Sequence, residues 1–130
     1  VKCPVLLVSD IERGGCFASI YGTIKLLKIK HQRLFKGFII NKFRGDDNIL
    51  DGAIRFIEYS TKMINLGIIP KIEFFLPPED SLDEINYSFK NIEKLHLTKC
   101  LDKQIDLVAS NIERKLDLET ILTRVLKIKK

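Results

Sequence analysis

The sequence predicts an α/β fold in which a parallel β-sheet is flanked by helices. Three short, mainly apolar runs lie at residues 4–9, 36–41 and 65–70, and none of them alternates with polar residues. Such runs are typical of strands that are buried on both faces, as in a parallel sheet covered by helices. Segments with helical spacing of apolar residues separate them. The order strand, helix, strand, helix, strand predicts a βαβαβ unit with right-handed crossovers.

Each element of this unit has its own signal. The first strand, PVLLVS at residues 4–9, ends at a charged segment with a Gly-Gly pair, and residues 16–27 then carry apolar side chains at helical spacing. The second strand, KGFIIN at residues 36–41, is followed by a second predicted helix at residues 46–62. The third strand, NLGIIP at residues 65–70, ends at a proline, which cannot donate to a strand ladder.

The remainder of the chain is less regular. Residues 77–100 predict an irregular linker, and residues 101–130 carry apolar side chains at helical spacing. We expect one or two amphipathic helices there, with a break near residues 116–118. The chain is thus predicted to be a single domain over residues 1–130, with its βαβαβ core at residues 3–76.

Composition limits the class of protein. The 130 residues suit one compact core, and 45% hydrophobic with 30% charged residues is an ordinary globular balance. No apolar run approaches the roughly 20 residues that span a bilayer. A charged-then-apolar leader is not apparent. We therefore expect a cytoplasmic protein without a membrane partner.

Cysteine content and charge point away from two further classes. The three cysteines are odd in number and far apart, so we expect reduced, mostly buried thiols rather than disulfides or a zinc site. The net charge of +5 is spread along the chain, and stacking aromatics do not interleave with the basic residues. A solvated surface, or a polyanionic ligand such as a nucleotide, is therefore favoured over nucleic acid.

Candidate site residues follow the predicted strands. In open α/β sheets, ligands bind beyond the carboxyl ends of the strands. This rule selects residues 9–15, 41–46 and 69–75, which we expect to meet at one edge of the sheet.

The first of these places can hold an anion. Gly14 and Gly15 permit a tight turn, and the N–H groups of the helix that follows favour a phosphate or a carboxylate. Arg13 can add a bidentate contact to the same anion, and Asp10 can orient a metal ion or a water. The alternative is a glycine-rich turn with a surface Asp–Arg pair.

The other two places suit a base. The Asn41 amide carries a donor and an acceptor and can pair with a purine edge, while Lys42 and Arg44 can lie along a base or reach a phosphate. Pro70 can present a flat apolar face to a planar ring. The alternatives are a turn that Asn41 caps and a proline that only ends its strand.

Several catalytic signatures are absent from the sequence. There is no GxxxxGK[ST] phosphate loop, and no constellation of cysteine, histidine and acid can be identified. His31 and His96 lie in polar segments and are expected at the surface.

Four segments together resemble a known family. In order along residues 4 to about 82 they are PVLLVSDIERGGCFASIYGTIKLL, KGFIINKFRGD, LGIIP and PPEDSL. This series resembles glutamine-hydrolysing cobyric acid synthases, in the C-terminal part of their ATP-binding synthetase domain. The first two segments are long and specific.

The resemblance implies a fold and a reaction. The fold would be a partial, dethiobiotin synthetase-like domain of the P-loop NTPase class that lacks the phosphate loop. In the complete enzyme, ATP and Mg²⁺ activate peripheral carboxylates of adenosylcobyrinic acid a,c-diamide. Ammonia from a glutamine amidotransferase domain then forms the amides, a step of cobalamin biosynthesis.

The resemblance also implies roles for individual residues. The implied nucleotide contacts are Asn41, Lys42 and Pro70. The implied contacts to substrate or phosphate are Arg13, Gly14, Gly15 and Cys16. The implied contributors to magnesium or corrinoid binding are Asp10, Glu79 and Asp80. For Cys16, at a helix start, packing is favoured over a reactive thiolate.

The sequence also departs from the family. The phosphate loop, the acidic magnesium-binding segment and the glutaminase domain are not found in it. We therefore expect the isolated chain to be inactive and to bind ATP and Mg²⁺ weakly. Its expected partners are an N-terminal synthetase half, the amidotransferase domain and the corrinoid, with homo-oligomers possible through an exposed sheet edge.

Two alternatives remain open. One is a degenerate, non-catalytic module that binds a nucleotide or a corrinoid. The other is a related synthetase such as cobyrinic acid a,c-diamide synthase, whose closing helix residues 102–121 resemble.

Overall fold

The structure, a computed structural model, describes residues 3–73 and 91–127. The chain divides into two compact units, one of Val1–Lys71 with Glu113–Lys130 and one of Ile72–Ile112. The sheet and the candidate site both lie in the first unit.

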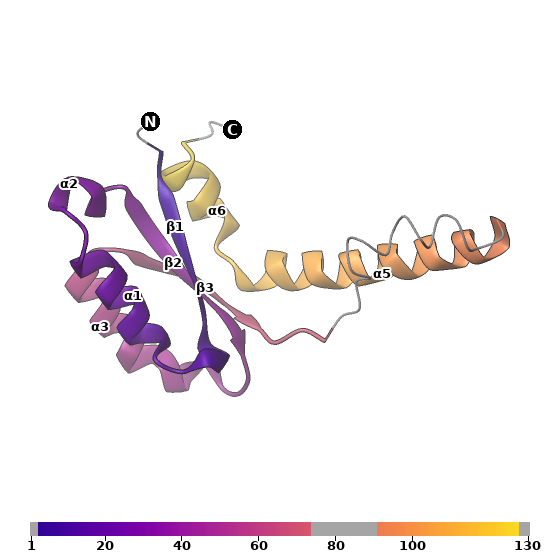
Figure 1. Cartoon of the computed structure of the whole chain (residues 1–130), viewed down its shortest axis with the longest axis horizontal. Helices are drawn as coiled ribbons and strands as arrows, with labels where there is room; N and C mark the ends of the chain where they lie inside the picture. The colour runs from indigo at the N-terminus through magenta and orange to yellow at the C-terminus, as the bar shows by residue number, and fades with distance from the viewer. Residues whose placement is uncertain (1–2, 74–90, 128–130) are drawn as a thin grey trace. The chain divides into compact units, whose positions relative to one another are not determined.

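A three-stranded parallel sheet forms the centre of this unit (Figure 1). Its strands are β1 (Val5–Asp10), β2 (Phe35–Phe43) and β3 (Ile64–Pro70), in the order β1-β2-β3. Both strand pairs are parallel. The predicted α/β class with a parallel sheet is therefore confirmed, and the three strands include the three predicted runs almost entirely.

Helices connect the strands, as the crossover rule requires. The long ones are α1 (Cys16–Lys25) and α3 (Asp51–Thr61), which contact each other beside the sheet (Figure 1). Two short elements were not predicted, the 3₁₀ turn η1 (Ile11–Arg13) and α2 (Ile29–Gln32). The first turn of the helix predicted at residues 46–62 is a separate 3₁₀ turn, η2 (Asp47–Leu50). Elements of one turn are too short to produce a readable hydrophobic period.

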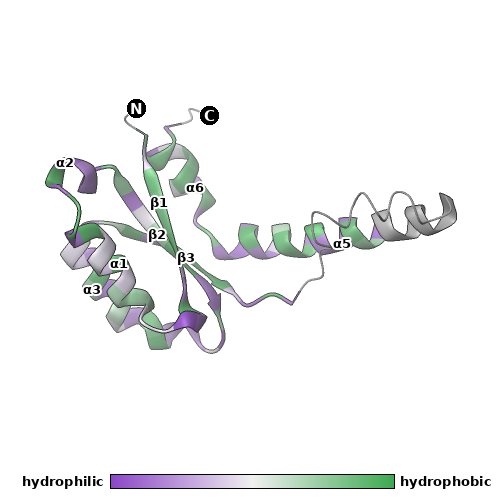
Figure 2. Ribbon diagram, in the orientation of Figure 1, coloured by the Kyte–Doolittle hydropathy of each residue, from purple (hydrophilic) through white to green (hydrophobic). Residues whose placement is uncertain are grey.

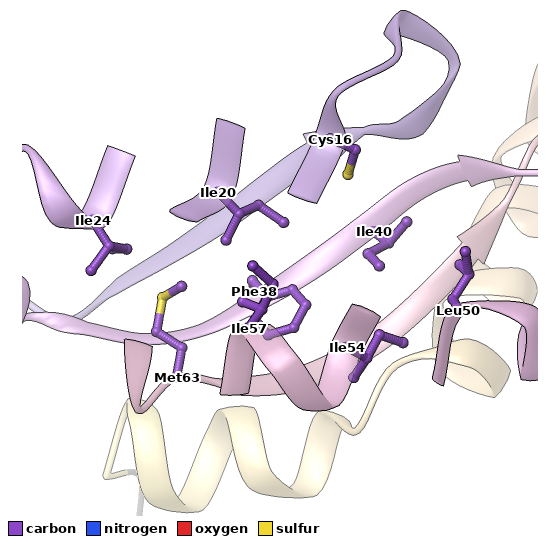
Figure 3. Close-up of a cluster of buried hydrophobic side chains, with 9 residues drawn as sticks. All are labelled: Cys16, Ile20, Ile24, Phe38, Ile40, Leu50, Ile54, Ile57 and Met63. Atoms are coloured by element: carbon purple, nitrogen blue, oxygen red, sulfur yellow. The ribbon is translucent and has the colours of Figure 1, made fainter. Parts of the chain in front are cut away.

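The main core lies between β2 and the two long helices (Figure 3). Phe38 and Ile40 of the middle strand point toward α1 and α3, because alternate side chains of a strand share a face. The buried members of this core are Cys16, Ile20, Ile24, Phe38, Ile40, Leu50, Ile54, Ile57 and Met63.

The C-terminal segment of the first unit attaches to the outer edge of β3. The Asp117 N–H donates to the Leu66 carbonyl at 2.8 Å, and Gly67 forms an antiparallel bridge with Leu116. The segment then forms two short helical pieces, α6 (Leu118–Thr120) and η3 (Ile121–Val125). Its contacts thus cover one of the two edges of the sheet.

A small second group of buried residues lies outside the main core. It consists of Ile39 of β2, Leu66 of β3 and Val125 of η3. Ile39 alternates with Phe38 and Ile40 along β2, so it faces the side of the sheet away from α1 and α3.

Gly67 is required by the close approach of the C-terminal segment. Its φ of +145° is unfavourable for other residues, and a Cβ there would clash with the Lys115 carbonyl and the Leu116 side chain. We expect Gly67→Ala to lower the free energy of unfolding by about 1–3 kcal/mol, measured by urea denaturation. Gly52→Ala on α3 is the control, because a Cβ there meets nothing within 4 Å. Equal stability of the two variants would contradict the observed docking of the segment.

A long helix, α5 (Asn91–Lys115), forms most of the described second unit and ends in the first. The sequence predicted an irregular linker up to residue 100, whereas the helix already begins at Asn91. Its first turns read NIEKLHL, which is polar but rich in helix-forming Leu, Lys and Glu. The helix ends where a break was expected. The rest of the predicted linker, residues 77–90, lies outside the described residues.

None of the helices in the described part of the chain has both the length and the apolar character needed to cross a membrane.

Candidate functional site

The candidate site lies at the carboxyl edge of the sheet. Asp10, the last residue of β1, is the register partner of Asn41 on β2. Pro70, the last residue of β3, is the partner of Phe43 at the end of β2. The expected convergence of the three strand ends is confirmed. Figure 2 shows the change from hydrophobic to hydrophilic residues along the strands, with green strand interiors and purple residues where β1 and β2 reach this edge.

The turn after β1 is shaped by one carboxylate and two glycines. Asp10 Oδ1 accepts a hydrogen bond from the Glu12 N–H at 3.0 Å and thereby caps η1. Gly14 and Gly15 follow with φ of +69° and +62°, values that glycine adopts readily. Gly15 is the N-cap of α1 and has no side chain to cap it. The first N–H groups of α1 are therefore left for solvent or a ligand.

Ion pairs connect this turn to the ends of the other two strands. The Lys42 ammonium lies 2.7 Å from Asp10 Oδ2. Glu12 Oε1 lies 2.5 Å from the Lys71 ammonium and 3.5 Å from the Arg44 guanidinium. We call these five residues the carboxyl-edge cluster: Asp10, Glu12, Lys42, Arg44 and Lys71. The two acids thus link all three strand ends.

The ion pairs also set the charge state of the two acids. The hydrogen bond from Lys42 lowers the pKa of Asp10, and the hydrogen bond from Lys71 lowers the pKa of Glu12. Both acids are therefore ionised at neutral pH, and they partly neutralise the cations around them. Exposed pairs of this kind contribute little to stability. A ligand anion can compete with the acids for the same cations.

Lys42 has an unusual backbone. Its φ is +63°, in the left-handed region that few residues other than glycine, asparagine and aspartate adopt. The Asn41 side chain stabilises this turn, because its Oδ1 accepts from the Lys42 N–H at 3.0 Å. Among the described residues, no acceptor pairs with the Asn41 amide nitrogen. Asn41 therefore offers a donor to a ligand, while its acceptor is already engaged.

Arg13 and Cys16 have opposite surroundings. The Arg13 side chain is 87% exposed, with its Nε 4.0 Å from Asp10 Oδ2, so the guanidinium is open to an anion. The Cys16 thiol is buried in the main core (Figure 3). Any contact of Cys16 with a ligand would therefore come from its backbone N–H. The expectation of mostly buried thiols is wrong for Cys3 and Cys100, which are exposed.

The described residues provide no ready metal site. No group of three or more His, Cys, Asp or Glu side chains lies close enough together, within residues 3–73 and 91–127, to hold a metal ion. Asp10, the predicted contributor, instead contacts the Lys42 ammonium, which a divalent cation would have to displace. Glu79 and Asp80 lie outside the described residues.

Sequence reasoning missed two members of the cluster. Glu12 and Lys71 each follow a predicted strand end, as the selected residues do, but the sequence gives no sign of their pairing across 59 positions. The rule that ligand sites lie at strand ends predicts where these two residues lie. It does not predict that they form an ion pair.

Comparison with known proteins bears out the resemblance to cobyric acid synthases. The chain is 56% identical over 79 residues to a probable cobyric acid synthase of Methanoregula boonei. It is 50% identical over 84 residues to one of Thermococcus kodakarensis, and 48% identical over 94 residues to a cobyric acid synthase of Prochlorococcus marinus strain MIT 9215.

The alignments cover most of this chain but only a small part of each relative. The alignments include 61%, 65% and 72% of this chain, respectively, but only 16%, 17% and 18% of the relatives. The chain thus spans less than a fifth of the length of the curated relatives it matches. No family model matches the chain, and no solved structure does. The expected dethiobiotin synthetase-like, P-loop NTPase class therefore remains a prediction.

Proposed function

We propose that this chain contributes to an ATP- and glutamine-dependent ligase of the cobyric acid synthase type. That enzyme would amidate peripheral carboxylates of adenosylcobyrinic acid a,c-diamide in cobalamin biosynthesis. One observation carries the proposal, namely 45–56% identity to cobyric acid synthases over most of the chain. The arrangement of the carboxyl edge supports it, because polar groups of several strands converge where α/β proteins bind ligands.

The nucleotide base would lie against the ends of β2 and β3. The amide nitrogen of Asn41, which has no acceptor in the described part of the chain, is a donor suited to a ring nitrogen of adenine. Pro70 presents an apolar ring at the neighbouring strand end, and Phe43 is its register partner. Lys42 would lie beside the base or reach a phosphate.

The anionic groups would lie against the turn after β1. Arg13 is exposed and can bind a phosphate or a substrate carboxylate through two hydrogen bonds. The N–H groups that follow Gly14 and Gly15, at the start of α1, add a favourable field. Binding an anion here would draw Lys42, Arg44 or Lys71 away from the two acids of the carboxyl-edge cluster.

ATP, when bound with Mg²⁺, supplies the phosphoryl group that activates a carboxylate for attack by ammonia. The residues of this chain would then bind and orient the base and the anionic groups. Among the described residues no group could hold a metal ion, so we expect the ligands for Mg²⁺ to lie outside these residues, and the glutaminase activity to come from the amidotransferase domain.

A chimera tests the proposal. The aligned segment of the Methanoregula boonei relative would be replaced by the corresponding residues of this chain. We expect the purified chimera to form amides from the a,c-diamide with ATP and glutamine, followed by mass spectrometry. The unmodified relative is the positive control. A chimera that folds like the relative but forms no amide would overturn the proposal.

Calorimetric titration of the isolated chain separates the proposal from its main alternative. We expect weak or undetectable binding of ATP with Mg²⁺, because the chain lacks a phosphate loop. Tight binding would instead favour the non-catalytic nucleotide-binding module.

A further inference from the structure

A second hollow lies at the opposite, amino-terminal edge of the sheet. It has a volume of about 480 Å³ and lies between α2, the start of β2 and the end of α3. Its polar lining residues are Gln32, Arg33, Lys36, Thr61 and Lys62. This volume is within the range of sites for small molecules. The hollow is separate from the carboxyl edge, and the proposed function assigns it no role.

The charge around this hollow is one-sided. Residues 13–45 contain no aspartate or glutamate, although lysine and arginine recur throughout them. The part of this stretch nearest the hollow reads KLLKIKHQRLFK, at residues 25–36. Cations gathered around a concave surface raise the local concentration of anions.

The three cations that line the hollow have no acidic partner among the described residues. The Lys36 ammonium donates to the Arg33 carbonyl at 2.7 Å, so it lies beside Arg33 without being neutralised. The side chain of Glu58, which lies about one helical turn before Lys62, accepts a hydrogen bond from the Asn65 N–H at 2.8 Å instead of pairing with a cation of the hollow. Within residues 3–73 and 91–127, the cations of the carboxyl-edge cluster are paired with acids, whereas those of this hollow are not.

Lys62 occupies a backbone position that favours glycine. It is the C-cap of α3 with φ of +63°, and its N–H donates to the Glu58 carbonyl at 2.9 Å. Glycine is the usual residue at such a helix end. The Lys62 ammonium lies 4.6 Å from the centre of the Tyr59 ring. The chain thus carries a lysine at a backbone position with a conformational cost, and residues in such conformations are common at functional sites.

The other polar groups of the hollow are already engaged. Thr61 Oγ1 donates to the Ile57 carbonyl at 2.6 Å, and Gln32 Nε2 donates to the Leu27 carbonyl at 2.8 Å. Recognition in this hollow therefore depends on its charges.

From the hollow and its unpaired cations, we propose that this amino-terminal edge binds a small multivalent anion, carrying two or more phosphate or carboxylate groups. Arg33 would hold one group through two hydrogen bonds, and Lys36 and Lys62 would contact a second.

Two-dimensional NMR of the chain tests the proposal. Sodium tripolyphosphate and citrate would be titrated separately, so that the two arms distinguish phosphate from carboxylate ligands. We expect the backbone amides of Arg33, Lys36 and Lys62 to shift, and Arg33→Gln with Lys36→Gln to weaken binding about tenfold. The matched control is Arg55→Gln with Lys115→Gln, which removes the same net charge at two residues that do not line the hollow and that pair with Asp51 and Asp47. Equal weakening in both double variants, or shifts confined to the carboxyl-edge cluster, would overturn the proposal.

Lys62→Gly separates binding from a structural role. Glycine suits the left-handed backbone, so we expect a higher urea midpoint together with about threefold weaker tripolyphosphate binding. Unchanged binding in this more stable variant would remove Lys62 from the site. Unchanged binding in the double variant as well would overturn the proposal.

Discussion

Phe38→Ala is expected to lower the free energy of unfolding by about 3–5 kcal/mol. Phe38 is completely buried in the middle strand of the sheet, and it belongs to the core that α1 and α3 form with β2 (Figure 3). Removing the ring loses the free energy of its burial and leaves a cavity. Ile20 and Ile57 of the same core lie on separate helices, so we do not expect them to fill this cavity completely. Packed interiors relax only partly around such a loss.

Guanidinium denaturation followed by circular dichroism measures this effect. A domain of this size is expected to have about 5–15 kcal/mol of stability in total, so the variant will unfold at low denaturant. Phe56→Ala is the matched control, because Phe56 is 59% exposed and contacts the Tyr21 ring at a centroid distance of 5.9 Å. We expect it to cost under about 1.5 kcal/mol.

Comparable losses in the two variants would contradict the described core. If Phe38→Ala does not fold at all, Phe38→Leu provides a milder measurement. Its loss should still exceed that of Phe56→Leu, since only the first position is closed to solvent.

The strands and long helices could be predicted because their signals are local. The apolar run that ends at Ser9 and the helical spacing of Ile20 and Ile24 both reflect burial in the sheet and core. Parallel pairing followed from chain order, since each strand is joined to the next through a helix. The same argument placed Asp10, Asn41 and Pro70 at one edge.

The features that escaped prediction depend on contacts between distant residues. The Glu12–Lys71 pair joins positions 59 apart, and neither residue carries a periodic signal of its own. The left-handed backbone of Lys42 has no local signature either, because lysine rarely adopts it. The bridge between Gly67 and Leu116 likewise joins distant positions of the chain, and neither residue carries a local signal for it.

The two ends of the sheet therefore present different electrostatic surfaces. At the carboxyl edge, Asp10 and Glu12 hold the nearby cations in ion pairs. At the amino-terminal edge, no acid does so among the described residues. An anion that binds Lys42, Arg44 or Lys71 must displace carboxylates, whereas one that binds the second edge need displace only water and counterions. Affinity at the second edge should consequently depend more directly on salt concentration.

Asn41→Asp, made in the chimera with the Methanoregula boonei relative, is expected to raise the KM for ATP about 10- to 100-fold with a smaller change in kcat. The substitution is nearly isosteric, and it distinguishes the role of the amide oxygen from that of the amide nitrogen. Aspartate keeps an oxygen that can accept from the Lys42 N–H, as Asn41 Oδ1 does at 3.0 Å, but it loses the free donor proposed to contact adenine. A buried hydrogen bond removed in this way typically costs about 1–3 kcal/mol, and repulsion between carboxylate and ring nitrogen adds to it.

Steady-state kinetics with ATP, and with GTP as the competing nucleotide, measure the effect. An interaction made equally in the ground state and the transition state alters KM rather than kcat, which is the pattern expected for a contact remote from the phosphates. Asn48→Asp is the matched control, because Asn48 is exposed and its amide donates to Asp46 at 2.7 Å. It should leave the KM for ATP unchanged. If Asn41→Asp behaves like this control, the donor of Asn41 does not contact the base, and its capping of the Lys42 turn is then its whole role.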